Sequence, residues 1–251
     1  METIETKETV AQTVPRILLV IPAYNESENI ERVVENLRTN YPQYDYLVVN
    51  DCSTDTTGDI LRGKGYNHLS LPLNLGIGGA VQSGYLYGAE KDYDVVIQID
   101  GDGQHDPAYV KDLVAPIVAG EADMVIGSRF LQKKGFQTSF LRRMGIGVIR
   151  GVIKLCCGVR IKDTTSGFRA TSKELTRLFA KEYAQDYPEP EAIVLAELRG
   201  YRVKEVPVEM NERMGGRSSI NALRSVYYMI KVSLALILAR VGIGRRRKRK
   251  S

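Results

Sequence analysis

Two aspartates, one residue apart, follow an apolar segment near the middle of the chain. The segment is residues 95–99, and the pair is Asp100 and Asp102. Because side chains alternate along an extended strand, residues two apart face the same way, so these carboxylates would lie side by side. Carboxylates that close repel each other unless a cation lies between them, and hard oxygen ligands suit Mg²⁺ or Mn²⁺. With the amide oxygen of Gln104 at the next position, the spacing predicts a divalent metal site.

Two other interpretations of this segment must be weighed. Asp and Gly are common in solvated turns, and the pair alone does not separate a turn from a metal site. A calcium loop of the EF-hand type requires Gly at its sixth position and Glu at its twelfth. Counted from Asp100, those positions hold His105 and Lys111, which excludes an EF-hand loop.

The elements that position these residues follow from hydrophobic periodicity. In the first half, short apolar runs alternate with segments of helical period, which is typical of βαβ units and a mostly parallel sheet. The predicted strands are 17–21, 46–49, 68–71, 95–99 and 124–126, and the predicted helices include 30–37, 57–62 and 78–89. Polar residues follow three of the strands: Asn25 and Glu26, Asp51, and Asp100. Ligands bind at the carboxyl ends of strands in such sheets, so we expect these side chains to gather at one edge.

The second half is less regular. A helix is predicted over 139–157, a Pro-rich loop over 187–191 precedes a helix to 198, and a strand covers 201–208. Residues 211–219 form a basic, Gly-containing loop of a kind that can close over phosphates.

The C-terminal segment has a character of its own. Apolar residues recur at steps of three and four, which predicts one apolar face on a helix over 220–243: Ile220, Leu223, Tyr227, Ile230, Leu234, Ile237 and Val241. Lys231 and Arg240 interrupt the run, so a single membrane span is not expected. A helix lying in the membrane interface, followed by a polybasic tail at 244–251, fits better. The alternative is a helix that packs on the protein's own core or on a partner protein.

Composition limits the remaining possibilities. The chain has 251 residues, 43% hydrophobic and 26% charged, as in an ordinary soluble globular protein. Residues 1–14 are polar, and we expect them to be disordered. They lack the apolar core of a secretory signal, so we expect a cytoplasmic protein. The three cysteines match neither a disulfide framework nor a metal site. The net charge of +5 comes from the run at 245–250, which favours contact with an anionic membrane surface or a membrane-protein partner and not nucleic acid.

Several motifs in combination resemble family-two glycosyltransferases with the GT-A fold, most closely the dolichol-phosphate mannose synthase-like branch. The motifs are Pro22-Ala23-Tyr24-Asn25-Glu26, Asn50-Asp51-Cys52-Ser53-Thr54-Asp55, Asn74-Leu75-Gly76-Ile77-Gly78-Gly79-Ala80, Asp100-Gly101-Asp102-Gly103-Gln104-His105, Gly127-Ser128-Arg129, Ser166-Gly167-Phe168-Arg169, and Glu212-Arg213 with Gly216 and Ser218. The resemblance implies an α/β fold over 15–219, with a Rossmann-like, mostly parallel sheet flanked by helices. The C-terminal amphipathic helix would follow this domain.

The resemblance also implies roles for individual residues. Pro22, Tyr24, Glu26, Asp51, Asn74, Gly76 and Asp100 would bind the nucleotide of a GDP-, UDP- or dTDP-sugar. Asp100, Asp102 and Gln104 would hold Mg²⁺ or Mn²⁺ at the diphosphate, and Arg213 would contact the donor phosphates. Arg129 and one of Arg142 or Arg143 would meet an anionic acceptor. The metal and the guanidinium would stabilise the charge of the leaving group in an inverting displacement.

The acceptor stays open between two classes. A polyprenyl phosphate, undecaprenyl or dolichyl, is an anionic nucleophile that needs no base, and it would place the enzyme at the cytoplasmic face of a membrane. A sugar hydroxyl of a lipid-linked or cell-surface polysaccharide needs a carboxylate base, for which Glu189 and Glu191 are candidates. The alternative is that these two acids only stabilise a helix N-terminus, where the helix dipole favours negative charge.

The chain departs from the family pattern at four positions. Cys52 replaces a usual Gly and Ile77 replaces a common Lys, which leaves the donor open. Ile146 and Ser219 replace a Ser and a Lys on the acceptor side. A non-catalytic, nucleotide-binding partner of a membrane transferase is a further alternative. An NAD-dependent oxidoreductase is disfavoured, because the glycines at 76, 78 and 79 lack the G-x-G-x-x-G spacing.

Overall fold

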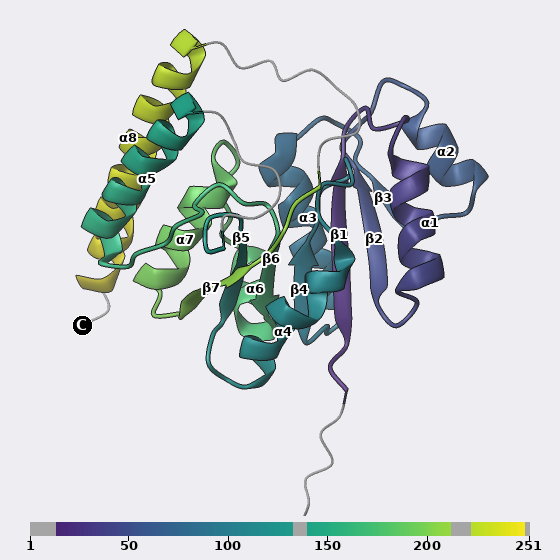
Figure 1. Ribbon diagram of the computed structural model, residues 1–251, viewed down its shortest axis with the longest axis horizontal. Coiled ribbons are helices and arrows are strands. Elements are labelled where there is room, and N and C mark those ends of the chain that lie inside the picture. The colour runs from purple at the N-terminus through teal and green to yellow at the C-terminus, as the bar shows by residue number, and fades with distance from the viewer. Residues whose placement is uncertain (1–13, 133–139, 212–221, 249–251) are drawn as a thin grey trace, which may run out of the picture.

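A seven-stranded sheet runs through the middle of the molecule (Figure 1). The structure is a computed structural model, which describes residues 14–132, 140–211 and 222–248. The strand order is β3-β2-β1-β4-β6-β5-β7. The strands are β1 (Ile17–Ala23), β2 (Asp45–Asn50), β3 (His68–Ser70), β4 (Val95–Gln98), β5 (Met124–Ser128), β6 (Arg169–Ser172) and β7 (Val203–Pro207). All five strands predicted in the first half are present.

One half of the sheet is entirely parallel. β1 pairs in parallel with β2 and β4, and β2 pairs in parallel with β3. Leu18 and Val20 of β1 pack into one hydrophobic core, while Leu19 and Ile21 pack into a second core on the other face. Burial on both faces explains why the strand is apolar without alternation.

The other half contains the single antiparallel strand of the sheet. β6 lies between β4 and β5 and pairs antiparallel with both, and β7 then pairs in parallel with β5. The sequence did not predict β6, because only four residues form it and the first is an arginine. The arrangement confirms the expected α/β fold with a mostly parallel sheet.

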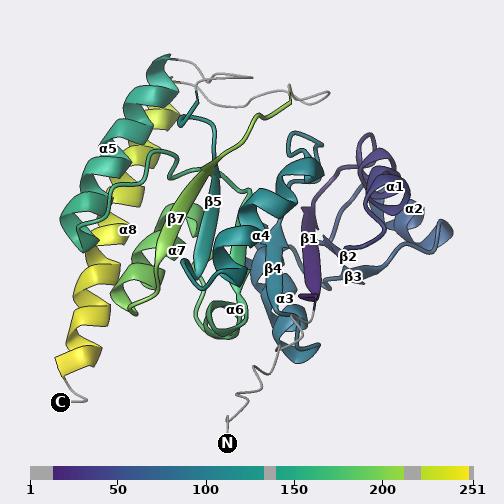
Figure 2. The ribbon, with the colours of Figure 1, turned by 60° about the horizontal axis from the view of Figure 1, so that its bottom comes forward.

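Helices cover both faces of the sheet. The core on one face receives side chains from α1 (Ile30–Asn40), α2 (Thr57–Gly63) and α4 (Val110–Val118), which follows the short 3₁₀ helix η1 (Pro107–Tyr109). The opposite core receives α3 (Gly76–Glu90), α5 (Phe140–Cys157), α6 (Lys173–Phe179), α7 (Pro188–Leu198) and α8 (Ala222–Lys248). Figure 2 shows α5 and α8 side by side at the flank beyond β7.

Helix α8 is longer than the sequence suggests. It continues to Lys248, so the boundary expected at residue 243 and the first basic residues of the expected tail lie within the helix. Arg and Lys are good helix formers, and cations are favoured at a helix C-terminus, which accounts for the extension. Among the described residues, none of the helices has the length and apolar character needed to cross a membrane.

Candidate active site

The aspartate pair lies in a tight turn directly after β4. Asp102 is 7% exposed, and its Oδ1 accepts a hydrogen bond from the backbone N–H of Gln104 at 3.0 Å. Gly103 has a φ of +77°, a left-handed conformation that favours glycine and closes the turn. The Asp100 side chain stays 36% exposed. The turn, and not simple strand alternation, therefore sets the direction of the two carboxylates.

An imidazole contacts Asp100 at two points. The backbone N–H of Asp100 donates to Nδ1 of His105 at 3.0 Å, so the neutral ring carries its proton on Nε2. That Nε2 lies 3.5 Å from Oδ2 of Asp100. The ring is buried and stacks on Phe168, with 4.8 Å between ring centroids. His105 thus orients the carboxylate of Asp100 in the way that residues behind a metal ligand usually do.

The chain approaches Asp100 closely from the other side at Gly167. A Cβ added to Gly167 would lie 2.9 Å from Oδ1 of Asp100 and 3.1 Å from Nε2 of Gln98. A side chain at this position would have to displace the carboxylate of Asp100, so glycine here leaves that carboxylate its present position.

Residues 163–167 are held in place by a buried ion pair. Nε and Nη2 of Arg129 each donate at 2.7 Å to the two carboxylate oxygens of Asp163, which is fully buried. Glu205 of β7 accepts hydrogen bonds from the backbone N–H groups of Lys162 and Asp163. Burial alone would lower the pKa of Arg129, but bonding to Asp163 and the charge of Asp100 raise it above its ordinary value. Arg129 therefore lies beside Asp100 but is already paired; its contact with an acceptor stays a prediction.

A second buried arginine connects this turn to α7. Arg169, at the start of β6, is fully buried. It donates to the backbone carbonyl oxygens of Thr164, Ser166 and Glu189. The N-terminus of α7 is thereby attached to the turn that touches Asp100.

The expected nucleotide residues that follow β2 and precede α3 contact each other. Oδ1 of Asp51 accepts from the backbone N–H of Leu75 at 2.7 Å, and Nδ2 of Asn74 donates to the carbonyl oxygen of Asp51 at 3.2 Å. Oδ1 of Asn74 accepts from the N–H of Gly76, which has a φ of +74°. Cys52 also has a positive φ, +57°. The left-handed conformation at Cys52 explains why glycine is usual there in the family that the sequence resembles.

The loop after β1 lies against the aspartate turn. A Cβ added to Gly101 would lie 3.2 Å from the carbonyl oxygen of Pro22 and 3.7 Å from Cγ of Glu26. Tyr24 is 48% exposed at the same loop. Oδ1 of Asn25 accepts from the N–H groups of Thr54 and Asp55, which ties this loop to the segment after β2. The residues expected to bind the nucleotide and those expected to bind the metal are therefore adjacent.

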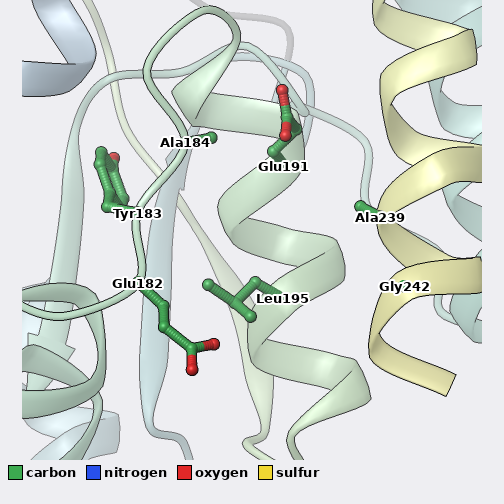
Figure 3. A pocket seen from close by; sticks show the side chains of 7 residues that line it. All are labelled: Glu182, Tyr183, Ala184, Glu191, Leu195, Ala239 and Gly242. Carbon is green, nitrogen blue, oxygen red and sulfur yellow. The ribbon is translucent and has the colours of Figure 1, made fainter. Parts of the chain in front are cut away.

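The two acids on the first turn of α7 lie in different surroundings. The carbonyl of Glu189 accepts from Arg169 as described above. Glu191 borders a cavity of about 380 Å³ with Leu195 of α7 and Ala239 and Gly242 of α8 (Figure 3). Burial, and then the charge of Asp186, raise the pKa of Glu191 above its ordinary value.

Three expected residues lie wholly or partly outside the described part of the chain. Arg213 falls in 212–221, which is not described. Arg142 and Arg143 lie on the first turn of α5, but their side chains are not described. The strand-like segment that leads to Arg213 does lie at the site: Asn211 donates its N–H to the carbonyl oxygen of Gln104, and Met210 pairs with His105.

The side chains at the turn fit a hard divalent cation that also binds a substrate. Within residues 14–132, 140–211 and 222–248, no group of three or more His, Cys, Asp or Glu side chains is suited to hold a metal. Two carboxylates and an amide form the available set instead. Mg²⁺ commonly binds proteins in this way, through one or two carboxylates together with substrate phosphates and water.

The sequence assigned no role to three residues that contact Asp100 or hold the neighbouring segments in place. They are His105, Asp163 and Arg169. His105 and Arg169 lie within motifs quoted above, and Asp163 lies three residues before one of them. For Asp163 and Arg169, the available sequence signal was a charged residue on either side of the Ser166-Gly167 turn. Asp163 pairs with Arg129, 34 residues away, and Arg169 also reaches Glu189, 20 residues away, so local spacing did not reveal these contacts.

Comparison with known proteins identifies the family. Residues 18–179 match the model of glycosyl transferase family 2. An undecaprenyl-phosphate mannosyltransferase from Micrococcus luteus is 31% identical over 82% of this chain and 88% of its own length. A polyprenol monophosphomannose synthase from Mycolicibacterium smegmatis is 31% identical over 87% of this chain and 86% of its own.

A solved structure has the same fold. The glucosyl-3-phosphoglycerate synthase of Mycobacterium tuberculosis, in complex with Mn²⁺, uridine diphosphate and phosphoglyceric acid, matches with a TM-score of 0.65 and 24% identity. The match covers 91% of this chain and 79% of that one. The family model and the two relatives lead to one conclusion: the chain is a glycosyltransferase of family 2, in the dolichol-phosphate mannose synthase-like branch.

Proposed function

We propose that the protein transfers a hexose from a nucleotide sugar to a polyprenyl phosphate, with inversion at the anomeric carbon. The observation that carries this proposal is the close approach of Gly101, in the Asp100–Gln104 turn, to Pro22 of β1 and to Glu26, because it puts the proposed cation ligands near the proposed nucleotide residues. The names of the two bacterial mannosyltransferases support a polyprenyl phosphate as acceptor.

Each residue of the proposed site would have a distinct role in the reaction. Asp100, Asp102 and Gln104 would hold Mg²⁺ or Mn²⁺, which when bound offsets the negative charge of the leaving diphosphate. Arg213 would contact the same phosphates, because a planar guanidinium binds phosphate in a fixed geometry. The acceptor oxygen attacks the anomeric carbon as the bond to the diphosphate breaks, and no covalent intermediate with the enzyme forms.

A phosphate acceptor needs cations and no base. Arg142 or Arg143, at the start of α5, would meet it together with Arg129. A polyprenyl phosphate is ionised at neutral pH, so its oxygen attacks without losing a proton. The enzyme would then work at the cytoplasmic face of a membrane.

Glu191 favours a second candidate function, transfer to a sugar hydroxyl. It is half-buried beside a cavity, and its raised pKa brings it closer to the neutral range in which a general base is most effective. Substitution of Glu189→Gln and Glu191→Gln separates the two candidates. With a phosphate acceptor each variant keeps most of its activity, whereas loss of a base costs about a hundredfold or more.

The direct test measures sugar transfer with purified protein. GDP-, UDP- and dTDP-hexoses are supplied with Mn²⁺, with and without polyprenyl phosphate, and labelled lipid product is extracted. Transfer to lipid is expected from one donor class, and Asp102→Ala abolishes it. Asp112→Asn, an exposed acid on α4, is the matched control and keeps full activity. Transfer to a glycan but not to the lipid would favour the second candidate.

A further inference from the structure

We propose that a contact between α3 and the segment 183–187 sets the distance between the donor and acceptor sides of the active site. Gly78 and Gln185 would be positioning residues, because neither is expected to touch a substrate. The segment leads into the first turn of α7, where Glu189 and Glu191 lie. The inference rests on the proposed function only in taking this turn as part of the acceptor side.

The contact brings two main chains together. A Cβ added to Gly78 would lie 2.4 Å from the carbonyl oxygens of Ala184 and Gln185 and 2.5 Å from Cα of Gln185. Gly78 does not have a positive φ, so its conformation does not require glycine. Glycine inside a helix is unfavourable relative to alanine, and here it leaves the space that the segment occupies. With a side chain at this position, α3 and the segment would have to move about 1 Å apart to reach ordinary van der Waals distance.

Two glutamine side chains support the same contact. Nε2 of Gln185 donates to Oε1 of Gln82, on α3, at 2.8 Å. Nε2 of Gln82 donates in turn to the carbonyl oxygens of Phe179 and Ala180, at the end of α6. Oε1 of Gln185 would lie 3.1 Å from a Cβ added to Gly79. Gln82 therefore connects α3 to both ends of the stretch 179–185.

The donor side is attached to the same turn of α3. Oδ1 of Asp51 accepts a hydrogen bond from the backbone N–H of Leu75, the residue directly before the helix. Leu75 and Gly78 lie within one helical turn of each other. The piece of main chain that holds Asp51 is therefore continuous with the piece that the segment touches.

The other side of the segment faces the acceptor side. Ala184 borders the cavity of about 380 Å³ together with Glu191 (Figure 3). Arg169 holds the carbonyl of Glu189, so the first turn of α7 is attached to the aspartate turn as well. A displacement of about 1 Å between reacting groups can lower a rate about a hundredfold. The space that Gly78 leaves is therefore large enough to affect sugar transfer.

The test compares sugar transfer with hydrolysis of the donor, because attack by water needs only the donor side. The ratio of the two rates does not depend on the fraction of active enzyme, so loss of folded protein alone leaves it unchanged. Labelled GDP-, UDP- and dTDP-hexoses are supplied with Mn²⁺ and polyprenyl phosphate. Gly78→Ala is expected to lower the ratio about 10- to 100-fold, with the Kd of the nucleoside diphosphate within about twofold of wild type.

The matched control is Gly88→Ala, on the same helix. Its Cβ would lie 2.5 Å from Cγ2 of Val96, a similar clash that does not involve the segment, and it is expected to keep the wild-type ratio. Gln185→Ala tests the contact without a clash and is expected to lower the ratio about two- to tenfold. Adding Gln82→Ala should lower it by less than the product of the two single effects, because the two residues share one hydrogen bond.

Equal ratios in Gly78→Ala and Gly88→Ala would overturn the proposal, and so would a loss of nucleotide affinity that accounts for the whole decrease. Hydrogen exchange tests the contact without any acceptor. The amides of 183–187 should exchange about tenfold faster or more in Gly78→Ala than in wild type, and unchanged exchange would refute the contact. If wild type hydrolyses the donor but forms no lipid product, the proposed acceptor is wrong, and the exchange measurement still decides whether α3 holds the segment.

Discussion

Asp100 is a metal ligand candidate whose carboxylate is confined from two sides. Nε2 of His105 lies 3.5 Å from one oxygen, and Gly167 leaves no room for a side chain at the other. Such confinement reduces the number of rotamers that the carboxylate can adopt before a cation binds. The position of the His105 imidazole should therefore influence how tightly Asp100 binds a cation.

Substituting His105→Asn tests this role. An asparagine Oδ1 can replace Nδ1 as acceptor for the Asp100 N–H, but nothing then reaches the carboxylate. We expect Mn²⁺ affinity in the presence of a nucleoside diphosphate to fall about 10- to 100-fold, measured by titration calorimetry. His68→Asn, on the edge strand β3, is the matched control. Nitrogen NMR of the metal-free protein should show the His105 proton on Nε2, and a proton on Nδ1 would contradict the assignment.

Residue-level chemistry was predictable where the atoms that matter are close in the chain. Asp100, Asp102 and Gln104 lie within five residues, so their spacing alone suggested a cation. Arg129 and Asp163 are 34 residues apart, and no local pattern indicates that they form a pair. The family resemblance implies that Arg129 contacts the acceptor, which stays a prediction, and the structure adds Asp163 as its immediate partner. Spacing in the sequence does not predict ion pairs between residues that are far apart in the chain.

At the scale of elements, the Arg129–Asp163 pair connects β5 to the turn that precedes β6. Asp163→Asn leaves the guanidinium without its carboxylate in a largely buried position. Breaking such a pair costs about 3–5 kcal/mol of unfolding free energy. The matched control is Asp123→Asn, which breaks the more exposed pair with Arg202 and should cost less than about 1 kcal/mol. Urea denaturation measures both values, and equal losses would contradict a structural role for the buried pair.

The elements themselves were predictable to different degrees. The parallel strands are apolar on both faces, so each appears in the sequence as a continuous hydrophobic run. β6 is four residues long and carries Arg169 in the core. Its pairing with β4 and β5, and not its own composition, therefore makes this segment a strand. The short helix α6 that follows it was missed for the same reason. For α8, periodicity identified the apolar face, but only packing shows that this face points away from the core.

On the scale of the whole molecule, the sheet has two halves that meet between β4 and β6. The parallel half carries Pro22, Asp51 and Asn74, which we assign to the donor. The other half carries Arg129 and leads to α5 and α7, which we propose to lie on the acceptor side. Tyr85 of α3 packs at this junction, with its ring centroid 5.3 Å from that of Phe179 on α6. Aromatic packing therefore joins helices from both halves.

Alkaline pH should weaken the whole fold through two tyrosines. Burial, opposed in part by the charge of Arg169, raises the pKa of Tyr85 to about 12. Burial, and then the hydrogen bond to Asp45, raise the pKa of Tyr93 to about 12. Both pKa values lie above the ordinary value of 10.0, so the folded state keeps the proton more strongly than the unfolded chain.

The stability that these tyrosines provide is therefore complete below about pH 10 and is lost as the pH rises towards 12. We expect the free energy of unfolding to fall by up to about 4 kcal/mol over this interval, measured by urea denaturation at each pH. The double variant Tyr85→Phe with Tyr93→Phe should make the profile shallower, because phenylalanine has no proton to lose; Tyr66 and Tyr183, whose pKa values burial also raises, still contribute. Tyr44→Phe, at a partly exposed position, should keep the wild-type slope. A double variant as sensitive to alkali as the wild type would show that other groups govern the loss, since only the two hydroxyls distinguish these proteins.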